Sequence, residues 1–168
     1  MPVDRVSGPM DDQGGVRERL ARHGVLPLRL FLGVTFLYAG LDKFLSGGPF
    51  SSVDREVMRS MLEFGRDTSA APWLVDLALD NAGPALTGVA VAEVVVGVLL
   101  LVGVLTRPAA MLGAVMALGF WVTVSWETSP YYFGGDLPYA VGFLTLALTG
   151  AGAFSVDSAR ATRRAAAR

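Results

Sequence analysis

The chain has 168 residues, of which 52% are hydrophobic and 17% charged, and its mean hydropathy is +0.49. This composition is too apolar for a water-soluble domain of this size and indicates several helices that are buried or face lipid. The net charge of -1 argues against a nucleic-acid-binding protein, which needs a clustered basic face. Because the sequence has no cysteine, a disulfide, a thiolate nucleophile and a cysteine-ligated zinc or iron–sulfur cluster are excluded.

The single histidine, His23, lies in a polar N-terminal segment. Since there is no second histidine, a haem held by two histidines inside a membrane is excluded as well. We therefore expect no haem, no iron–sulfur cluster and no metal, so any redox chemistry must use a diffusible or partner-held cofactor. Residues 1–25 mix both charge signs and contain Gly14 and Gly15, which predicts a flexible cytoplasmic tail.

Four apolar segments are close to the length that crosses ~30 Å of hydrocarbon, about 20 residues. They predict membrane-spanning helices at about 26–45, 84–105, 108–126 and 137–154. The first segment carries three charged side chains near its ends, where long side chains can reach the membrane surface at tolerable cost. The predicted fold is an all-α membrane protein, a four-transmembrane-helix bundle whose membrane domain covers residues 26–157.

The segment between spans one and two is predicted to be a helical, extracytoplasmic loop. Residues 51–54 have the chemistry of a helix N-cap. Apolar residues follow near helical spacing, which predicts an amphipathic helix on the outer membrane face: Val53, Val57, Met61 and Phe64. A second short helix is expected from Pro72 to the break at Asn81. Together the two helices would form a cap over the outer end of the bundle; an interfacial connector with no site beneath it is the alternative.

The placement of arginine predicts the orientation of the spans. Arginines precede span one, occupy the turn between spans two and three, and follow span four: Arg17, Arg19, Arg22, Arg107, Arg160, Arg163, Arg164 and Arg168. The loop between spans one and two instead carries three arginines against six acidic residues. We therefore expect a multi-pass protein of the plasma (inner) membrane with both termini, including a basic tail at 158–168, in the cytoplasm.

Glu93 lies almost at the centre of span two, inside the run VAVAEVVVGVLL. An unpaired carboxylate there costs at least ~2.5 kcal/mol, so Glu93 must be protonated, paired or beside water. At 100° per residue, spans one and two each present one stripe of charged and small residues, which would let the backbones approach closely. The stripes are Arg29, Gly33, Phe36, Gly40 and Lys43 on span one, and Glu93, Gly97, Leu100, Val104 and Arg107 on span two.

The expected depth in the membrane favours one of two possible partners of Glu93, which are Lys43 and Arg29. By helical rise, Lys43 is about 8 Å from Glu93 along the membrane normal and Arg29 about 12 Å. We therefore predict a Glu93–Lys43 pair as the candidate catalytic site and expect Arg29 to serve the cytoplasmic interface. A buried ion pair that only fixes the register of the helices is the alternative.

Aromatic residues gather in the predicted topology at the outer ends of the spans. Tyr131 and Tyr132 are among them, and such residues usually form an ordinary interfacial belt. A cavity that they line beside Lys43 would instead suit a flat amphipathic ligand such as a quinone headgroup. On that reading the candidate cofactor-binding residues are Arg29, Tyr38, Trp121, Trp126 and Tyr139.

Several short motifs occur in order along the predicted spans. They are Arg29-Leu-Phe-Leu-Gly33, then Phe36, Gly40 and Lys43-Phe44, then Glu93 to Gly97, Gly103 to Ala109, and Gly152 to Asp157. In order and spacing they resemble the DoxX family, and Arg29, Lys43, Glu93 and Arg107 match positions of that family. The resemblance implies a four-helix integral membrane protein of the bacterial plasma membrane.

Relatives in that family include the DoxD-type subunit of thiosulfate:quinone oxidoreductase. Other DoxX-like proteins associate with redox-defence enzymes such as superoxide dismutase and a sulfurtransferase. The resemblance therefore implies a membrane subunit of a quinone-linked oxidoreductase or redox-defence complex, with a non-covalently bound quinone and a soluble redox enzyme as partner. A non-catalytic membrane anchor or assembly partner is the alternative, a transporter is a weaker one, and assembly into a homo-oligomer is a further expectation. Whether the chain is itself an enzyme stays open.

Overall fold

The computed structural model describes residues 15, 23–45, 55–130 and 134–167. Within these residues the regular secondary structure is helical throughout, which confirms the predicted all-α class. The helices are α2 (Leu26–Phe44), α3 (Arg55–Gly65), α4 (Pro72–Asp80), α5 (Ala82–Val102), α6 (Thr106–Thr123), α7 (Asp136–Thr149) and α8 (Val156–Ala166). The predicted tail at 1–25 and the predicted N-cap at 51–54 lie almost wholly outside the described residues.

Helices α2, α5, α6 and α7 correspond to the four predicted spans, but they differ in how well they suit a membrane. Within the described residues, only α5 is long and apolar enough to cross one by length and composition, and α7 is a shorter apolar helix. The 14 residues of α7 cover about 21 Å at 1.5 Å per residue, less than the ~30 Å of hydrocarbon. Helix length and composition thus identify one span, and the four-span bundle stays a prediction.

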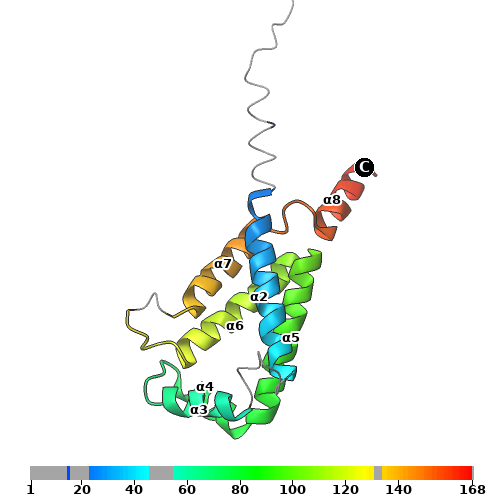
Figure 1. Cartoon of the computed structure of the whole chain (residues 1–168). Coiled ribbons are helices and arrows are strands. Elements are labelled where there is room, and N and C mark those ends of the chain that lie inside the picture. Colours follow the sequence, from blue (N-terminus) through cyan, green and yellow to red (C-terminus); the bar gives the residue numbers. More distant parts are fainter. Residues whose placement is uncertain (1–14, 16–22, 46–54, 131–133, 168) are drawn as a thin grey trace, which may run out of the picture.

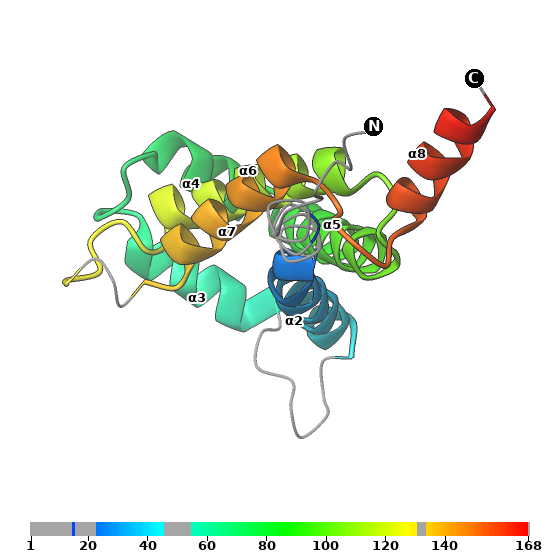
Figure 2. The ribbon, with the colours of Figure 1, turned by 90° about the horizontal axis from the view of Figure 1, so that it is seen from above.

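The four long helices pack as two pairs, α2 along α5 and α6 along α7 (Figure 1). Figure 1 also shows α3 and α4 at one end of these helices and α8 at the opposite end, beside the start of α2. Seen from above in Figure 2, α8 extends sideways, beyond the outline of α5. The helix bundle therefore has two distinct ends, one with the α3–α4 segment and one with α8.

Glycines let α2 and α5 approach closely. A Cβ atom on Gly97 would lie 2.5 Å from the backbone nitrogen of Leu37, and one on Gly40 would lie 2.7 Å from the carbonyl oxygen of Ala90. Both distances are far below van der Waals contact, so these positions exclude any larger residue. The middle of each predicted stripe lies in this interface, whereas Arg29 contacts the segment after α7, and Val104 and Arg107 lie beyond the end of α5.

Bulky apolar side chains are found both in the core and on the outer faces of the four helices. Alanines and glycines of α6 pack against Phe143 of α7 in the core, and the ring of Phe143 lies edge-on to that of Phe36, with centroids 4.5 Å apart. Other large apolar side chains lie exposed on the outer faces of the four helices. They include Phe31, Val34, Tyr38 and Leu41 of α2, Val91, Val95, Val98 and Val102 of α5, Met111, Leu112, Val115 and Leu118 of α6, and Val141, Leu144 and Leu148 of α7. Small residues where helices meet and many bulky apolar side chains on the outer faces are typical of helices that face lipid.

The predicted helices of the outer loop are present and dock on the end of α6. Helix α4 begins at Pro72 and ends at Asp80, as its sequence predicts. The segment between α3 and α4 is fixed by Val122, whose carbonyl oxygen accepts hydrogen bonds from Ala70 N (3.0 Å) and Ser69 Oγ (2.8 Å). The cap therefore lies against α5 and the end of α6.

The C-terminal tail is helical where the sequence predicts only a solvated or membrane-surface end. Ser155 begins α8 as an N-cap, its Oγ accepting a hydrogen bond from Ser158 N at 3.1 Å. The carboxylate of Asp157 accepts hydrogen bonds from Leu105 N (3.2 Å) and Thr106 N (2.9 Å). Helix α8 is thereby attached through its first turn to the α5–α6 turn.

Two residues near this attachment have left-handed backbones. Leu105 and Phe154 have φ of 50° and 51°, a conformation that costs an L-residue with a side chain about 1–2 kcal/mol. Two glycines with positive φ, Gly150 and Gly152, end α7 at Thr149, five residues before the end of the predicted span at Phe154. The connector 150–155 is therefore irregular backbone, and its carbonyl groups need partners outside a helix.

Candidate functional site

Lys43 and Glu93 form an ion pair across the α2–α5 interface. The Lys43 Nζ lies 2.7 Å from Glu93 Oε2, and the two side chains are 14% and 4% exposed. Lys43 Nζ also donates a hydrogen bond of 3.3 Å to the carbonyl oxygen of Ala39. The pairing that the sequence predicts is thus present, whereas its catalytic role stays a prediction.

The position of the pair follows from local helix geometry. Lys43 is one residue before the end of α2, and Gly40 lies one helical turn earlier on the same face. Because Gly40 has no side chain, α2 can approach Ala90 and Val94 of α5 to within backbone contact. That approach brings the ammonium group to Glu93, in the middle of the most apolar helix of the chain.

The chemistry available to the pair is hydrogen bonding and proton exchange. A buried ammonium–carboxylate contact of this length is a charge-assisted hydrogen bond. Removing one partner would leave the other charge buried and uncompensated, which is strongly unfavourable. The ammonium has two further N–H donors beyond the one directed at Glu93, and one of them is directed at Ala39. Among the residues that the structure describes, the third donor has no acceptor.

Arg29 lies at the α8 end of the bundle and is buried there. Its side chain is 1% exposed and is surrounded by the connector 150–155. The guanidinium donates hydrogen bonds to the carbonyl oxygens of Ala151, Ala153 (3.2 Å) and Phe154 (2.8 Å). Arg29 lies 14 residues before Lys43, about 21 Å along α2, so it belongs to the opposite end of the bundle.

The predicted aromatic residues do not gather around the ion pair. Tyr38 is exposed on the outer face of α2, and Trp121 contacts Trp126 at the end of α6, with ring centroids 4.8 Å apart. Tyr139 stacks on Phe31, with centroids 5.9 Å apart. Within the described residues none of the four predicted aromatics forms a hydrogen bond with the Lys43–Glu93 pair. Tyr131 and Tyr132 lie outside the described residues.

The attachment of α8 is a functional feature that the sequence analysis missed. Asp157 is exposed to solvent on one side, yet burial of the rest of its carboxyl raises the pKa less than the hydrogen bonds from Thr106 and Leu105 lower it. The nearby charge of Arg160 lowers it further, so the pKa of Asp157 is below its usual range. The signal in the sequence is Ser155 followed three residues later by Ser158, which is typical of a helix start.

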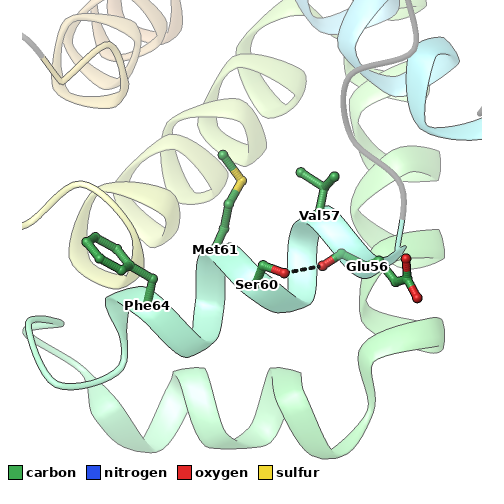
Figure 3. A pocket seen from close by; sticks show the side chains of 5 residues that line it. All are labelled: Glu56, Val57, Ser60, Met61 and Phe64. Carbon is green, nitrogen blue, oxygen red and sulfur yellow. Dashed lines mark hydrogen bonds between the residues drawn. The ribbon is translucent and has the colours of Figure 1, made fainter.

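A pocket of about 470 Å³ lies along α3 (Figure 3). Its lining consists of Glu56, Val57, Ser60, Met61 and Phe64. Figure 3 shows the side chains of Val57 and Met61 on the side of α3 that faces α6. The pocket is formed by the amphipathic helix that the sequence predicts, and it includes neither Lys43 nor Glu93.

A family model described as DoxX matches residues 24–126 of the chain. The match covers more than half of the sequence and includes both residues of the ion pair, whereas α7 and α8 lie beyond it. Neither the comparison with curated proteins nor the comparison with solved structures gave a match.

Proposed function

The chain belongs to the DoxX family of membrane proteins, and from that premise we propose that it is a membrane subunit of a quinone-linked oxidoreductase or redox-defence complex. In this proposal α2, α5, α6 and α7 all cross the bilayer. The support is that bulky apolar side chains are exposed on all four helices. Local thinning of the bilayer accommodates a helix as short as α7.

The proposed orientation has α3 and α4 outside the plasma membrane and α8 in the cytoplasm. Support comes from the arrangement in Figure 1, where the α3–α4 segment and α8 lie at opposite ends of the long helices. The arginines of α8 and the net negative charge of the outer loop agree with this orientation.

The observation that carries the function is the Lys43–Glu93 contact of 2.7 Å inside an apolar helix pair. A quinone supplies two-electron, two-proton redox chemistry when it is bound. Its carbonyl oxygens are hydrogen-bond acceptors, which fits the open donor of the Lys43 ammonium, and Glu93 is a group that can hold or give up a proton. Lys43 and Glu93 are therefore the residues that would hold the headgroup, and the fit rests on these two groups.

Each step assigned to this chain concerns a proton. Glu93 stabilises the ammonium of Lys43 and can accept its proton through the hydrogen bond that joins them. The apolar side chains of α2 and α5 exclude water from this exchange. The electrons come from a soluble redox enzyme in this proposal, because the sequence has no cysteine with which to hold a thiol or an iron–sulfur centre.

The test uses Glu93→Gln, which keeps the shape of the side chain and removes its ability to carry a proton. We expect loss of stoichiometric bound quinone and of quinone-dependent turnover per folded protein, together with lower membrane abundance, because the Lys43 ammonium is left uncompensated. The matched control is Glu127→Gln, because Glu127 is an exposed carboxylate in the loop after α6 and should behave as wild type. Full turnover in Glu93→Gln would discard the proton role.

The second candidate is a non-catalytic membrane anchor for a soluble enzyme. The observation in its favour is that the ion pair lies inside a glycine-lined interface, where it fixes the register of α2 against α5. This function predicts no bound quinone in the wild type, and the same fall in abundance and melting temperature in Glu93→Gln. The two candidates therefore differ in the quinone that the wild type binds.

A further inference from the structure

The α8 end of the protein carries basic and apolar side chains that the redox proposal does not use. We propose that this end binds the headgroups of anionic phospholipids in the membrane around the protein. Arg160, Arg163 and Arg164 of α8 would bind the phosphate groups, and Leu105 and Phe154 would contact the acyl chains beside them. This lipid site is independent of the Lys43–Glu93 pair.

The three arginines share one face of α8. At 100° per residue they fall within an arc of about 100°, and the opposite face carries alanine and threonine. All three side chains are exposed. Arg160 interacts electrostatically with Asp157, whereas Arg163 and Arg164 form no ion pair within the described residues. The helix therefore presents positive charge that the described chain does not neutralise.

The start of α8 is fixed at the level where α5 ends and α6 begins. Asp157 receives hydrogen bonds from Leu105 N and Thr106 N, and its own N–H donates to the carbonyl oxygen of Gly103 at 3.0 Å. The arginines follow three to seven residues later, about 5–11 Å along the helix. Because α8 extends sideways past α5 in Figure 2, they lie beside the ends of the long helices, where lipid headgroups would be.

Two bulky apolar residues near the start of α8 lie outside the core. Leu105 is 55% exposed and Phe154 is 76% exposed, although both have left-handed backbones. The ring of Phe154 contacts only one other ring in the described residues, that of His23, edge-on with centroids 5.6 Å apart. Water gives these strained, exposed side chains no favourable contact, whereas lipid acyl chains would.

The combination favours a lipid over an acidic protein as the occupant. The centre of a stable protein interface usually contains large apolar or aromatic side chains. Helix α8 has none on its arginine face except Val156, and the nearest bulky apolar groups, Leu105 and Phe154, lie at its base. The arginines would lie at the depth of the headgroups, and Leu105 and Phe154 at the depth of the acyl chains. This arrangement matches a phospholipid, whose headgroup is anionic and whose acyl chains are apolar.

The test measures lipid binding to the full chain purified in mild detergent. Phosphatidylglycerol is titrated in, and bound lipids are counted by native mass spectrometry. We expect the triple variant R160Q/R163Q/R164Q to lose about fivefold in affinity per arginine, on the order of a hundredfold in all. The charge-retaining variant R160K/R163K/R164K should keep most of the affinity, and the neutral lipid phosphatidylcholine should bind wild type and triple variant equally.

Two further variants locate the site. R59Q/R66Q removes two positive charges from the α3–α4 segment and should leave phosphatidylglycerol binding unchanged, whereas Phe154→Ala should weaken it several-fold. Equal phosphatidylglycerol affinity in wild type and R160Q/R163Q/R164Q would overturn the proposal. So would a preference of the arginine face for soluble polyglutamate over the lipid, which would assign this surface to an acidic protein.

Discussion

The ammonium of Lys43 on α2 lies 2.7 Å from the carboxylate of Glu93 on α5, and both side chains are largely buried. The contact joins the end of α2 to the middle of α5. Because the glycines at 40 and 97 bring the backbones together, the pair and the close helix packing depend on each other. Three of the four predictions below concern this pair and the two ends of α2.

Reversing the ion pair separates a structural role from a chemical one. The single variants Lys43→Glu and Glu93→Lys each bring two like charges together, and each should lose about 3–5 kcal/mol of unfolding free energy. The double variant restores opposite charges and should recover more than half of that loss in a detergent melting experiment. Quinone binding should not return, because the groups exchange depth. Recovery of both properties would show that only the pairing of charges matters.

Gly40 should not tolerate even one methyl group. In Gly40→Ala the new Cβ would lie 2.7 Å from the carbonyl oxygen of Ala90, which forces α2 and α5 apart and should cost about 1–3 kcal/mol. The matched control is Gly88→Ala, because a Cβ there meets nothing within 4 Å and alanine favours the helix by up to ~1 kcal/mol. Melting curves of the two variants should therefore shift in opposite directions.

Arg29 should hold the connector 150–155 in place. Arg29→Met leaves the carbonyl groups of Ala151, Ala153 and Phe154 without their donor, at a cost of about 1.5–3 kcal/mol for each hydrogen bond to a charged group. We expect faster hydrogen exchange at the amides of Gly103 and Asp157, measured by mass spectrometry. Exchange at Glu93 should stay as in wild type, since it lies at a different level of the bundle. Uniformly faster exchange would indicate global destabilisation instead.

The attachment of α8 should weaken in acid. Burial raises the pKa of Asp157, but the hydrogen bonds from Thr106 and Leu105 and the charge of Arg160 lower it more, so the folded pKa is below the reference of 3.8. The carboxylate thus stabilises the attachment above pH ~4, and this contribution is lost as pH falls through the folded pKa. The protection of the Thr106 amide, relative to its intrinsic exchange rate at each pH, should fall below pH 3.8, and Asp157→Asn should remove that pH dependence. An unchanged pH profile in the variant would contradict this assignment.

Helical periodicity was enough to predict the Lys43–Glu93 contact. Stripes at 100° per residue and a rise of 1.5 Å per residue relate any two residues on antiparallel straight helices, and α2 and α5 follow that geometry. Local sequence signals predicted the bounds of α4, because proline favours a helix start at Pro72 and the sequence at Asn81 indicates a helix end.

The environment of Arg29 was not predictable by such rules. Its partners are backbone carbonyl groups more than 120 residues away in the chain. Every residue has such a group, so the residue types do not indicate which ones accept the hydrogen bonds. The end of α7 at Thr149 was missed because hydropathy continues through Ala151 while the positive φ of Gly150 ends the helix. The contact of Tyr139 with Phe31 was also not predicted. Phe31 lies 12 residues and about 18 Å before Lys43 along α2, and the helical period does not determine how neighbouring helices tilt.

The hydrogen bonds from Arg29 to residues 151–154 also constrain biogenesis. A ribosome makes the first helix long before the connector, so the guanidinium enters the nascent fold without its final acceptors. Until those carbonyl groups have been synthesised, water or lipid headgroups must solvate the charge, which holds the start of α2 near the membrane surface. Closure of this end of the bundle therefore waits for residues 151–154, and a chain truncated before residue 151 cannot complete it.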